Sequence, residues 1–144
     1  MEKVKIGVLG LRRGLSHLRN CLQTPEAEVI GAADRIEGMR DRAAEMLAGM
    51  DRKVPLVSEF EQLLALKPDA IVLASNGRLQ AAQAVQALEA GCHVLSEVPG
   101  AYTQGEILHI ARTVEQTGKQ YMLAENSSFL AFPRYWRRWV IEGR

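Results

Sequence analysis

The 144-residue sequence has few of the features that mark secreted, membrane or metal-binding proteins. It contains only two cysteines, Cys21 and Cys92, and has neither a CxxC pair nor histidines at metal-ligand spacing. We therefore expect both thiols to be reduced and structural, and we expect no metal site. No signal-peptide pattern opens the chain, and no run approaches the ~20 apolar residues of a membrane span. These absences predict a soluble, cytoplasmic protein that does not bind membranes.

The sequence also lacks an excess of either charge. Lysine and arginine number 18 and aspartate and glutamate 17, for a formal net charge of +1. So small a net charge gives no reason to expect nucleic acid as a partner, and a small molecule fits better. No repeat, low-complexity tract or internal linker interrupts the chain, and its length suits one domain around one core.

What the sequence does contain is a regular alternation of short β-branched runs and helical patterns, which is typical of βαβ units. The runs predict strands at Val4 to Leu9, Glu28 to Ala33, Val54 to Val57, Ala70 to Ala74, His93 to Ser96 and Gln120 to Ala124. Apolar stripes at helical spacing, such as Leu79, Val85 and Leu88, lie between the strands and can face a sheet. The predicted fold class is α/β, a doubly wound parallel sheet of about six strands with helices on both faces, the Rossmann arrangement.

Local motifs mark the expected helix boundaries. Two capping boxes, Ser58-x-x-Glu61 and Thr103-x-x-Glu106, predict helix starts. Gly91 and Gly118 each follow a helical stripe and predict helix ends.

The end of the sequence gathers five of the eight aromatic residues, Phe129, Phe132, Tyr135, Trp136 and Trp139. Arginines lie between them, and such a mixture can stack on nucleic-acid bases. The helical spacing of these aromatic residues instead builds one apolar face, continued by Val140, so we interpret the segment as a packing helix. A stripe this apolar needs a covering surface, which predicts self-association into a homo-oligomer.

The turn after the first strand contains Gly7, Gly10 and Gly14 and is similar to the G-x-G-x-x-G dinucleotide motif, but it lacks the central glycine. The free amides of the following helix, together with Arg12 and Arg13, could bind a pyrophosphate. The alternative is a tight turn with two solvated arginines. The motif alone does not decide between them.

Asp34 favours the pyrophosphate interpretation. It follows the second strand 20 residues after Gly14, where an acidic side chain hydrogen-bonds the adenosine ribose of a dinucleotide. Its alternative role is a surface turn residue. Arg35 comes next and could pair with the 2′-phosphate of NADP. The predicted cofactor is therefore NAD or NADP, with NAD slightly favoured.

Polar side chains also follow the later strands. Ser75 and Asn76 come after the fourth strand, Glu97 after the fifth and Asn126 after the sixth. Because open α/β sheets bind ligands at the carboxyl ends of their strands, we expect these side chains to border the cofactor crevice.

The sequence as a whole resembles the amino-terminal domain of the glucose-fructose oxidoreductase, inositol dehydrogenase and MocA family, abbreviated Gfo/Idh/MocA. The resemblance covers essentially the entire chain. It rests on Val4 to Gly14, on Ala33-Asp34-Arg35, on residues 68–75 and 87–99, and on Asn126 to Phe129.

In that family the fifth strand ends in Glu-Lys-Pro, and the lysine contacts the nicotinamide ribose and assists proton transfer. Here Glu97 matches the glutamate and Val98 replaces the lysine, so a proton-transfer group worth ~10²–10⁴ in rate is missing. Residues 96–99 and 124–126 resemble a branch of the family that carries Glu-Val-Pro. By this resemblance Glu97, Val98 and Asn126 are cofactor-binding candidates.

The resemblance implies that residues 1–128 form the NAD(P)-binding domain and residues 129–144 a connecting helix toward a carboxyl-terminal substrate domain that the chain does not contain. Hydride transfer between nicotinamide and a sugar or polyol is the implied activity, with this chain alone inactive. Its catalytic residues are unknown, and the histidines His17, His93 and His109 are not candidates. The alternatives are a non-catalytic cofactor-binding sensor or regulator of the same fold, and a methyltransferase, whose sheet would carry an antiparallel edge hairpin.

Overall fold

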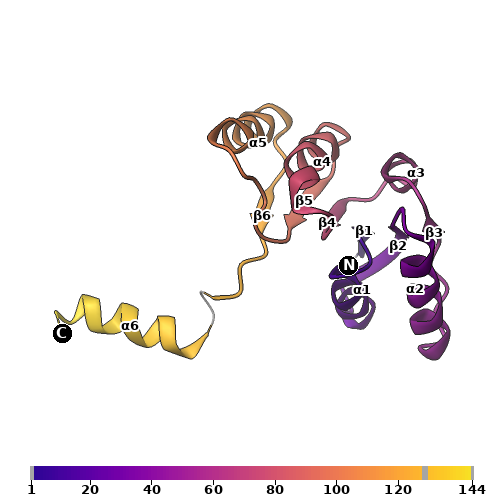
Figure 1. Cartoon of the computed structure of the whole chain (residues 1–144), viewed down its shortest axis with the longest axis horizontal. Coiled ribbons are helices and arrows are strands. Elements are labelled where there is room, and N and C mark those ends of the chain that lie inside the picture. Colours follow the sequence, from indigo (N-terminus) through magenta and orange to yellow (C-terminus); the bar gives the residue numbers. More distant parts are fainter. Residues whose placement is uncertain (1, 128–129, 144) are drawn as a thin grey trace.

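A computed structural model describes residues 2–127 and 130–143, in which strands and helices alternate (Figure 1). The strands are β1 (Val4–Leu9), β2 (Ala27–Ala33), β3 (Leu56–Val57), β4 (Ala70–Leu73), β5 (His93–Ser96) and β6 (Tyr121–Leu123). The helices are α1 (Gly14–Gln23), α2 (Glu37–Gly49), α3 (Phe60–Ala65), α4 (Gly77–Glu89), α5 (Gln104–Thr117) and α6 (Ala131–Ile141). Each predicted strand is present, although β3 is shorter than the predicted Val54 to Val57.

The strands form one sheet in the order β3-β2-β1-β4-β5-β6, and every neighbouring pair is parallel. The order reverses between β1 and β4, and this is the arrangement of a Rossmann sheet. The predicted fold class is confirmed. No antiparallel edge hairpin occurs in the described residues, which argues against the methyltransferase alternative.

Each face of the sheet has its own apolar core, because consecutive strand residues point to opposite sides. On one face, strand residues such as Val8 and Val72 pack with Leu18 of α1 and Ala43 of α2. The other face buries Leu9, Leu73 and Val94 against Leu63 of α3, Leu88 of α4 and Ile110 of α5. The helices α1 and α2 thus cover one face and α3, α4 and α5 the other (Figure 1).

The predicted capping box at the start of α5 is confirmed. Thr103 Oγ1 accepts a hydrogen bond from the Glu106 amide at 3.2 Å, and Glu106 Oε2 accepts one from the Thr103 amide at 2.9 Å. Both predicted helix-ending glycines have the expected positive φ, +86° at Gly91 and +66° at Gly118.

The predicted box at the start of α3 is wrong by one residue. Glu59 is the N-cap, and Gln62 Oε1 accepts hydrogen bonds from the amides of Ser58 and Glu59. Glu61, predicted to close the box, instead accepts a hydrogen bond from Gln86 of α4 at 3.0 Å. A tertiary contact therefore overrides the local motif here.

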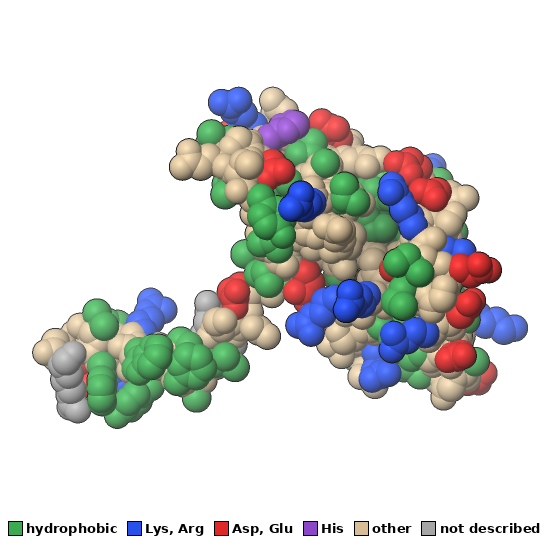
Figure 2. Space-filling view, viewed as in Figure 1, with side chains coloured by type: hydrophobic (Ala, Val, Ile, Leu, Met, Phe, Trp, Pro, Cys, Tyr) green, Lys and Arg blue, Asp and Glu red, His purple; other side chains and the backbone are tan. Residues whose placement is uncertain are grey.

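Helix α6 has no buried residue and extends away from the sheet (Figure 1). Its apolar side chains gather along the helix in Figure 2, and Trp136 is 59% exposed. Aromatic rings contact one another within α6, with centroid distances of 5.3 Å for Phe132 and Trp136 and 4.9 Å for Tyr135 and Trp139. The predicted helix and its apolar face are confirmed, while Phe129 lies outside the described residues. No helix among the described residues is long and apolar enough to cross a membrane.

Candidate functional site

The turn between β1 and α1 is built around Gly10. Its φ of +88° is unfavourable for residues with a side chain, and a Cβ there would lie 2.5 Å from the carbonyl oxygen of Ala74 and 2.6 Å from the Ser75 amide nitrogen. Gly14, the first residue of α1, packs closely as well, because a Cβ there would lie 3.1 Å from Val8. These contacts bring the start of α1 to the carboxyl edge of the sheet, between β1 and β4.

Asp34 lies directly after β2 and holds this turn in place. Its Oδ2 accepts a hydrogen bond from the Leu11 amide at 2.6 Å, and its Oδ1 accepts one from the Ile36 amide at 2.9 Å. The carboxylate is half-buried. A carboxylate oxygen can accept more than one hydrogen bond, so Asp34 retains acceptor capacity toward a ligand.

A cavity of about 720 Å³ opens beside this turn. Seven of the predicted site residues line it, namely Gly10, Arg12, Arg13, Asp34, Arg35, Ser75 and Asn76. Ile36 and Leu79 also line it, and their side chains are 63% and 43% exposed. The prediction that Leu79 faces the sheet is therefore wrong, because this end of α4 borders the cavity.

The rim at β4 is held by two glutamines that the sequence patterns did not single out. Ser75 Oγ donates a hydrogen bond to Gln83 Oε1, and Gln83 lines the cavity. The buried Gln80 side chain donates to the Ser75 carbonyl oxygen and accepts from the Gly100 amide, both at 3.2 Å. Asn76 caps α4 by accepting from the Arg78 amide at 3.0 Å.

Glu97, at the end of β5, joins that strand to α1. The same oxygen, Oε1, lies 3.0 Å from Arg13 Nε and 2.6 Å from His17 Nε2, and the Glu97 side chain is buried. Burial raises the pKa of Glu97, but the hydrogen bonds from His17 and Arg13 outweigh it and hold the pKa below its ordinary value. Sequence reasoning missed His17, although its place three residues after Gly14 on α1 is a signal that it lies near the strand ends.

The other predicted residues lie outside this cavity. Val98 is 44% exposed, Asn126 is exposed, and neither lines the cavity beside Asp34. Glu97 does not line the cavity, but its ion-pair partner Arg13 does. Ser128, the last residue of the predicted binding domain, lies outside the described residues. The structure thus places the β1, β2 and β4 residues together and the β5 and β6 residues beyond them.

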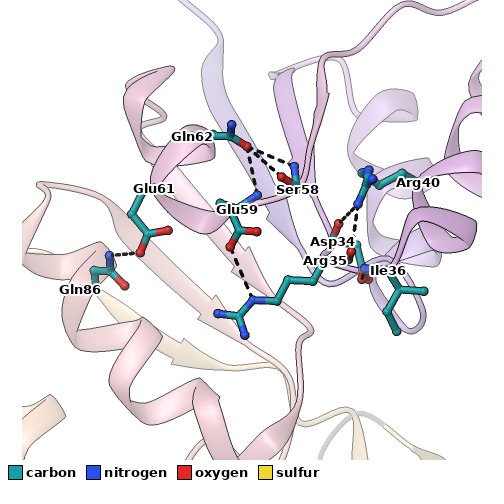
Figure 3. Close-up of polar contacts among 9 residues, drawn as sticks. All are labelled: Asp34, Arg35, Ile36, Arg40, Ser58, Glu59, Glu61, Gln62 and Gln86. Atoms are coloured by element: carbon teal, nitrogen blue, oxygen red, sulfur yellow. Dashed lines mark hydrogen bonds and ion pairs between the residues drawn. The ribbon is translucent and has the colours of Figure 1, made fainter.

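The segments that follow β2 and β3 form the outer wall of the cavity, and polar contacts hold them together (Figure 3). Arg35 Nε lies 3.6 Å from Glu59 Oε2, and both side chains are largely exposed. Arg40 of α2 donates through Nη1 to the carbonyl oxygens of Asp34 at 2.7 Å and Arg35 at 3.1 Å. Ser58 also lines the cavity on this side.

The Glu97 contacts predict a pH-dependent contribution to stability. Because the native pKa of Glu97 is lowered, its ionised form should stabilise the fold above the ordinary value of 4.5, and this contribution should be lost as the pH falls through the native pKa. We expect Glu97→Gln to lower the free energy of unfolding by ~1–2 kcal/mol at neutral pH.

Urea unfolding of the wild type and Glu97→Gln, at neutral pH and well below pH 4.5, would measure the difference. Glu45→Gln, on the exposed surface of α2, is the matched control. A wild-type advantage that stayed constant or grew in acid would contradict the assigned contacts.

Comparison with known proteins gives a family match over most of the chain. The model of the Gfo/Idh/MocA oxidoreductase family, NAD-binding Rossmann fold, matches residues 4–125. A glycosyl hydrolase family 109 protein from Shewanella sp. (strain MR-4) and an alpha-N-acetylgalactosaminidase from Shewanella oneidensis are each 29% identical over 136 residues. Each alignment covers 90% of this chain and 30% of the relative, so the chain spans about a third of their length.

Solved structures give the same fold. Scyllo-inositol dehydrogenase from Lactobacillus casei, with bound cofactor NAD(H) and scyllo-inositol, is similar with a TM-score of 0.83 and 27% identity, covering 99% of this chain and 42% of that one. The WlbA dehydrogenase from Chromobacterium violaceum, in complex with NADH and UDP-GlcNAcA, has a TM-score of 0.87 at 20% identity, covering 100% of this chain and 41% of that one.

Proposed function

This chain belongs to the Gfo/Idh/MocA oxidoreductase family as its NAD-binding Rossmann domain, and on that basis we propose that it binds NAD(H) for hydride transfer with a sugar or polyol. The observation that carries the proposal is the cavity at the reversal of strand order, where the Gly10 turn and the Asp34 carboxylate meet. Ligands of open α/β sheets bind at such a point.

The residues around the cavity fit the parts of a dinucleotide. Gly10 lines the cavity before the start of α1, where a pyrophosphate would bind, and Arg12 and Arg13 would pair with its charge. Asp34 would accept hydrogen bonds from the adenosine ribose hydroxyls, a role that favours NAD over NADP. The exposed apolar side chains of Ile36 and Leu79 would cover the adenine. Glu97, Val98 and Asn126 follow β5 and β6, and we place them toward the nicotinamide.

The nicotinamide supplies hydride transfer when it is bound, and the chain supplies binding and orientation. Val98 can neither donate nor accept a proton, and the Glu97 carboxylate pairs through Oε1 with Arg13 and His17. We therefore propose that proton transfer depends on groups outside this chain and that the domain works with a separate substrate-binding domain. Turnover by this chain alone is not expected.

Calorimetric titration with NADH and NADPH, followed by assays for nicotinamide reduction with a panel of sugars and inositols, tests the proposal. We expect weak NADH binding and no turnover, because the proposal assigns proton transfer and the substrate site to a separate domain. If neither nucleotide bound even at millimolar concentration, the cofactor assignment would fail. Turnover by this chain alone would overturn the two-domain proposal.

A second candidate function is glycoside cleavage that uses NAD. It is favoured by the curated relatives, which are named as glycosyl hydrolases and in one case as an alpha-N-acetylgalactosaminidase. Some glycosidases are NAD-dependent. Hydrolysis of a chromogenic N-acetylgalactosaminide by a longer protein carrying this domain, dependent on added NAD⁺, would favour this candidate. Cofactor binding with neither activity would favour the non-catalytic sensor or regulator.

We also propose that the chain self-associates through α6. Burial of one large apolar side chain is worth ~1.5–3 kcal/mol, and the exposed face carries Phe132, Tyr135, Trp136 and Trp139. We expect a dimer in sedimentation that dissociates more readily in Trp136→Ser and Trp139→Ser.

Ile107→Ser is the matched control, because it removes an exposed apolar side chain from α5. A monomeric wild type, or a dimer indifferent to both tryptophan changes, would refute self-association through α6.

A further inference from the structure

We propose that Glu59 selects NAD(H) over NADP(H) by holding the Arg35 guanidinium away from the 2′ position of the adenosine ribose. This inference rests on the cofactor site proposed above. It concerns the outer wall of the cavity, where the segments after β2 and β3 meet (Figure 3).

The position of Asp34 determines where the 2′ group of the adenosine ribose would lie. A ribose that hydrogen-bonds this carboxylate presents its 2′ group to the residues after β2 and β3. Arg35 and Ser58 line the cavity there. Of these two side chains, only the Arg35 guanidinium could form a charged, bidentate contact with a 2′-phosphate.

Arg35 already has a charged partner. Its Nε lies 3.6 Å from Glu59 Oε2, and Glu59 comes from a different element, the N-cap position of α3. The Glu59 backbone is fixed because its amide donates to Gln62 Oε1 at 3.1 Å. The pair therefore bridges the ends of β2 and β3, and it directs the guanidinium toward α3.

The other nearby arginines either donate to backbone oxygens or lie at the glycine turn. Arg40 donates to the carbonyl oxygens of Asp34 and Arg35 and is not among the cavity-lining residues. Arg12 and Arg13 line the cavity on the side of the glycine turn, where Arg13 pairs with Glu97. A 2′-phosphate would thus approach the carboxylate of Asp34 while the Arg35 guanidinium is paired with Glu59.

Replacing Glu59 with glutamine removes the charge and keeps the shape of the side chain. We expect Glu59→Gln to bind NADPH about fivefold more tightly than the wild type, since one negative charge near the 2′-phosphate disappears and Arg35 is released. NADH affinity should stay within about twofold, because the 2′-hydroxyl carries no charge. The gain should shrink at high salt, since both side chains are exposed.

Glu61→Gln is the matched control on the same helix. Neither Glu59 nor Glu61 lines the cavity, but Glu61 accepts a hydrogen bond from Gln86 and is not the ion-pair partner of Arg35. The Arg35 charge contributes last among the causes that lower the pKa of Glu61. Its substitution should change NADPH affinity less than Glu59→Gln does. An equal gain in both variants would overturn the specific role of Glu59.

A double variant tests whether Glu59 acts through Arg35. Calorimetry with NADH and NADPH would compare Arg35→Gln with Arg35→Gln/Glu59→Gln. We expect a smaller gain in NADPH affinity than in the presence of Arg35, because only the loss of the Glu59 charge then contributes. The same gain without Arg35 would refute the mechanism. NADH binding separates this inference from the proposed function: if NADH binds and Glu59→Gln leaves NADPH affinity unchanged, only the role of Glu59 fails, whereas no binding of either nucleotide refutes the site itself.

Discussion

Gly10→Ala is expected to lower the free energy of unfolding by about 3 kcal/mol or more. The φ of +88° alone costs a residue with a side chain about 1–2 kcal/mol. The new Cβ would also lie within 2.6 Å of backbone atoms of Ala74 and Ser75, which cannot move without displacing the end of β4. Urea unfolding would measure the loss, and NADH affinity should fall with it because the pyrophosphate turn is displaced.

Gly38→Ala is the matched control for this change. Gly38 lies in the first turn of α2, and a Cβ there meets nothing within 4 Å. Alanine is favoured over glycine in a helix by ~0.5–1 kcal/mol, so this variant should be slightly stabilised. A loss below about 1 kcal/mol in Gly10→Ala would mean that the turn tolerates a side chain, against the described packing.

Asp34→Ala should weaken NADH binding about tenfold, since the charge-assisted hydrogen bonds to the ribose are each worth ~1.5–3 kcal/mol and water replaces part of that energy. NADPH binding should be weakened less, because the same change removes a carboxylate that would repel the 2′-phosphate. The fold should also lose stability, because the Leu11 and Ile36 amides lose their acceptor.

Calorimetry on Asp34→Ala and Asp34→Asn separates these effects. The asparagine variant keeps one oxygen, which can accept from only one of the two backbone amides, so it should recover part of the stability while NADH affinity remains reduced. Asp41→Ala, on the exposed surface of α2, controls for the loss of a charge. Unchanged NADH affinity in Asp34→Ala would leave this carboxylate a purely structural role.

The sequence was sufficient to predict the sheet and to place the residues at the ends of β1, β2 and β4 at one site. Buried parallel strands are continuous apolar runs, and parallel strand ends meet at one edge, so Gly10, Asp34, Ser75 and Asn76 could be placed together from chain order alone. No such rule predicts which side chains from distant elements contact one another. The bond between His17 and Glu97 spans 80 positions in the chain.

Local motifs failed where a tertiary contact competed with them. Ser58-x-x-Glu61 satisfies the capping-box pattern, but Glu61 pairs with Gln86 and Gln62 takes over the cap one residue later. Helical periodicity likewise identifies an apolar face without saying what covers it. Leu79 borders a cavity, and the α6 stripe has no buried residue.

Amide chemical-shift mapping during titration of the isotope-labelled chain with NAD⁺ tests the cofactor site most directly. The proposed site predicts saturable shifts at Gly10, Leu11, Asp34 and Ser75, with little change at Lys5, at the opposite end of β1. The absence of saturable shifts would contradict the assignment. Shifts confined to the separate hollow between α2 and the segment before β3, lined by Ala48 and Pro55, would contradict it as well.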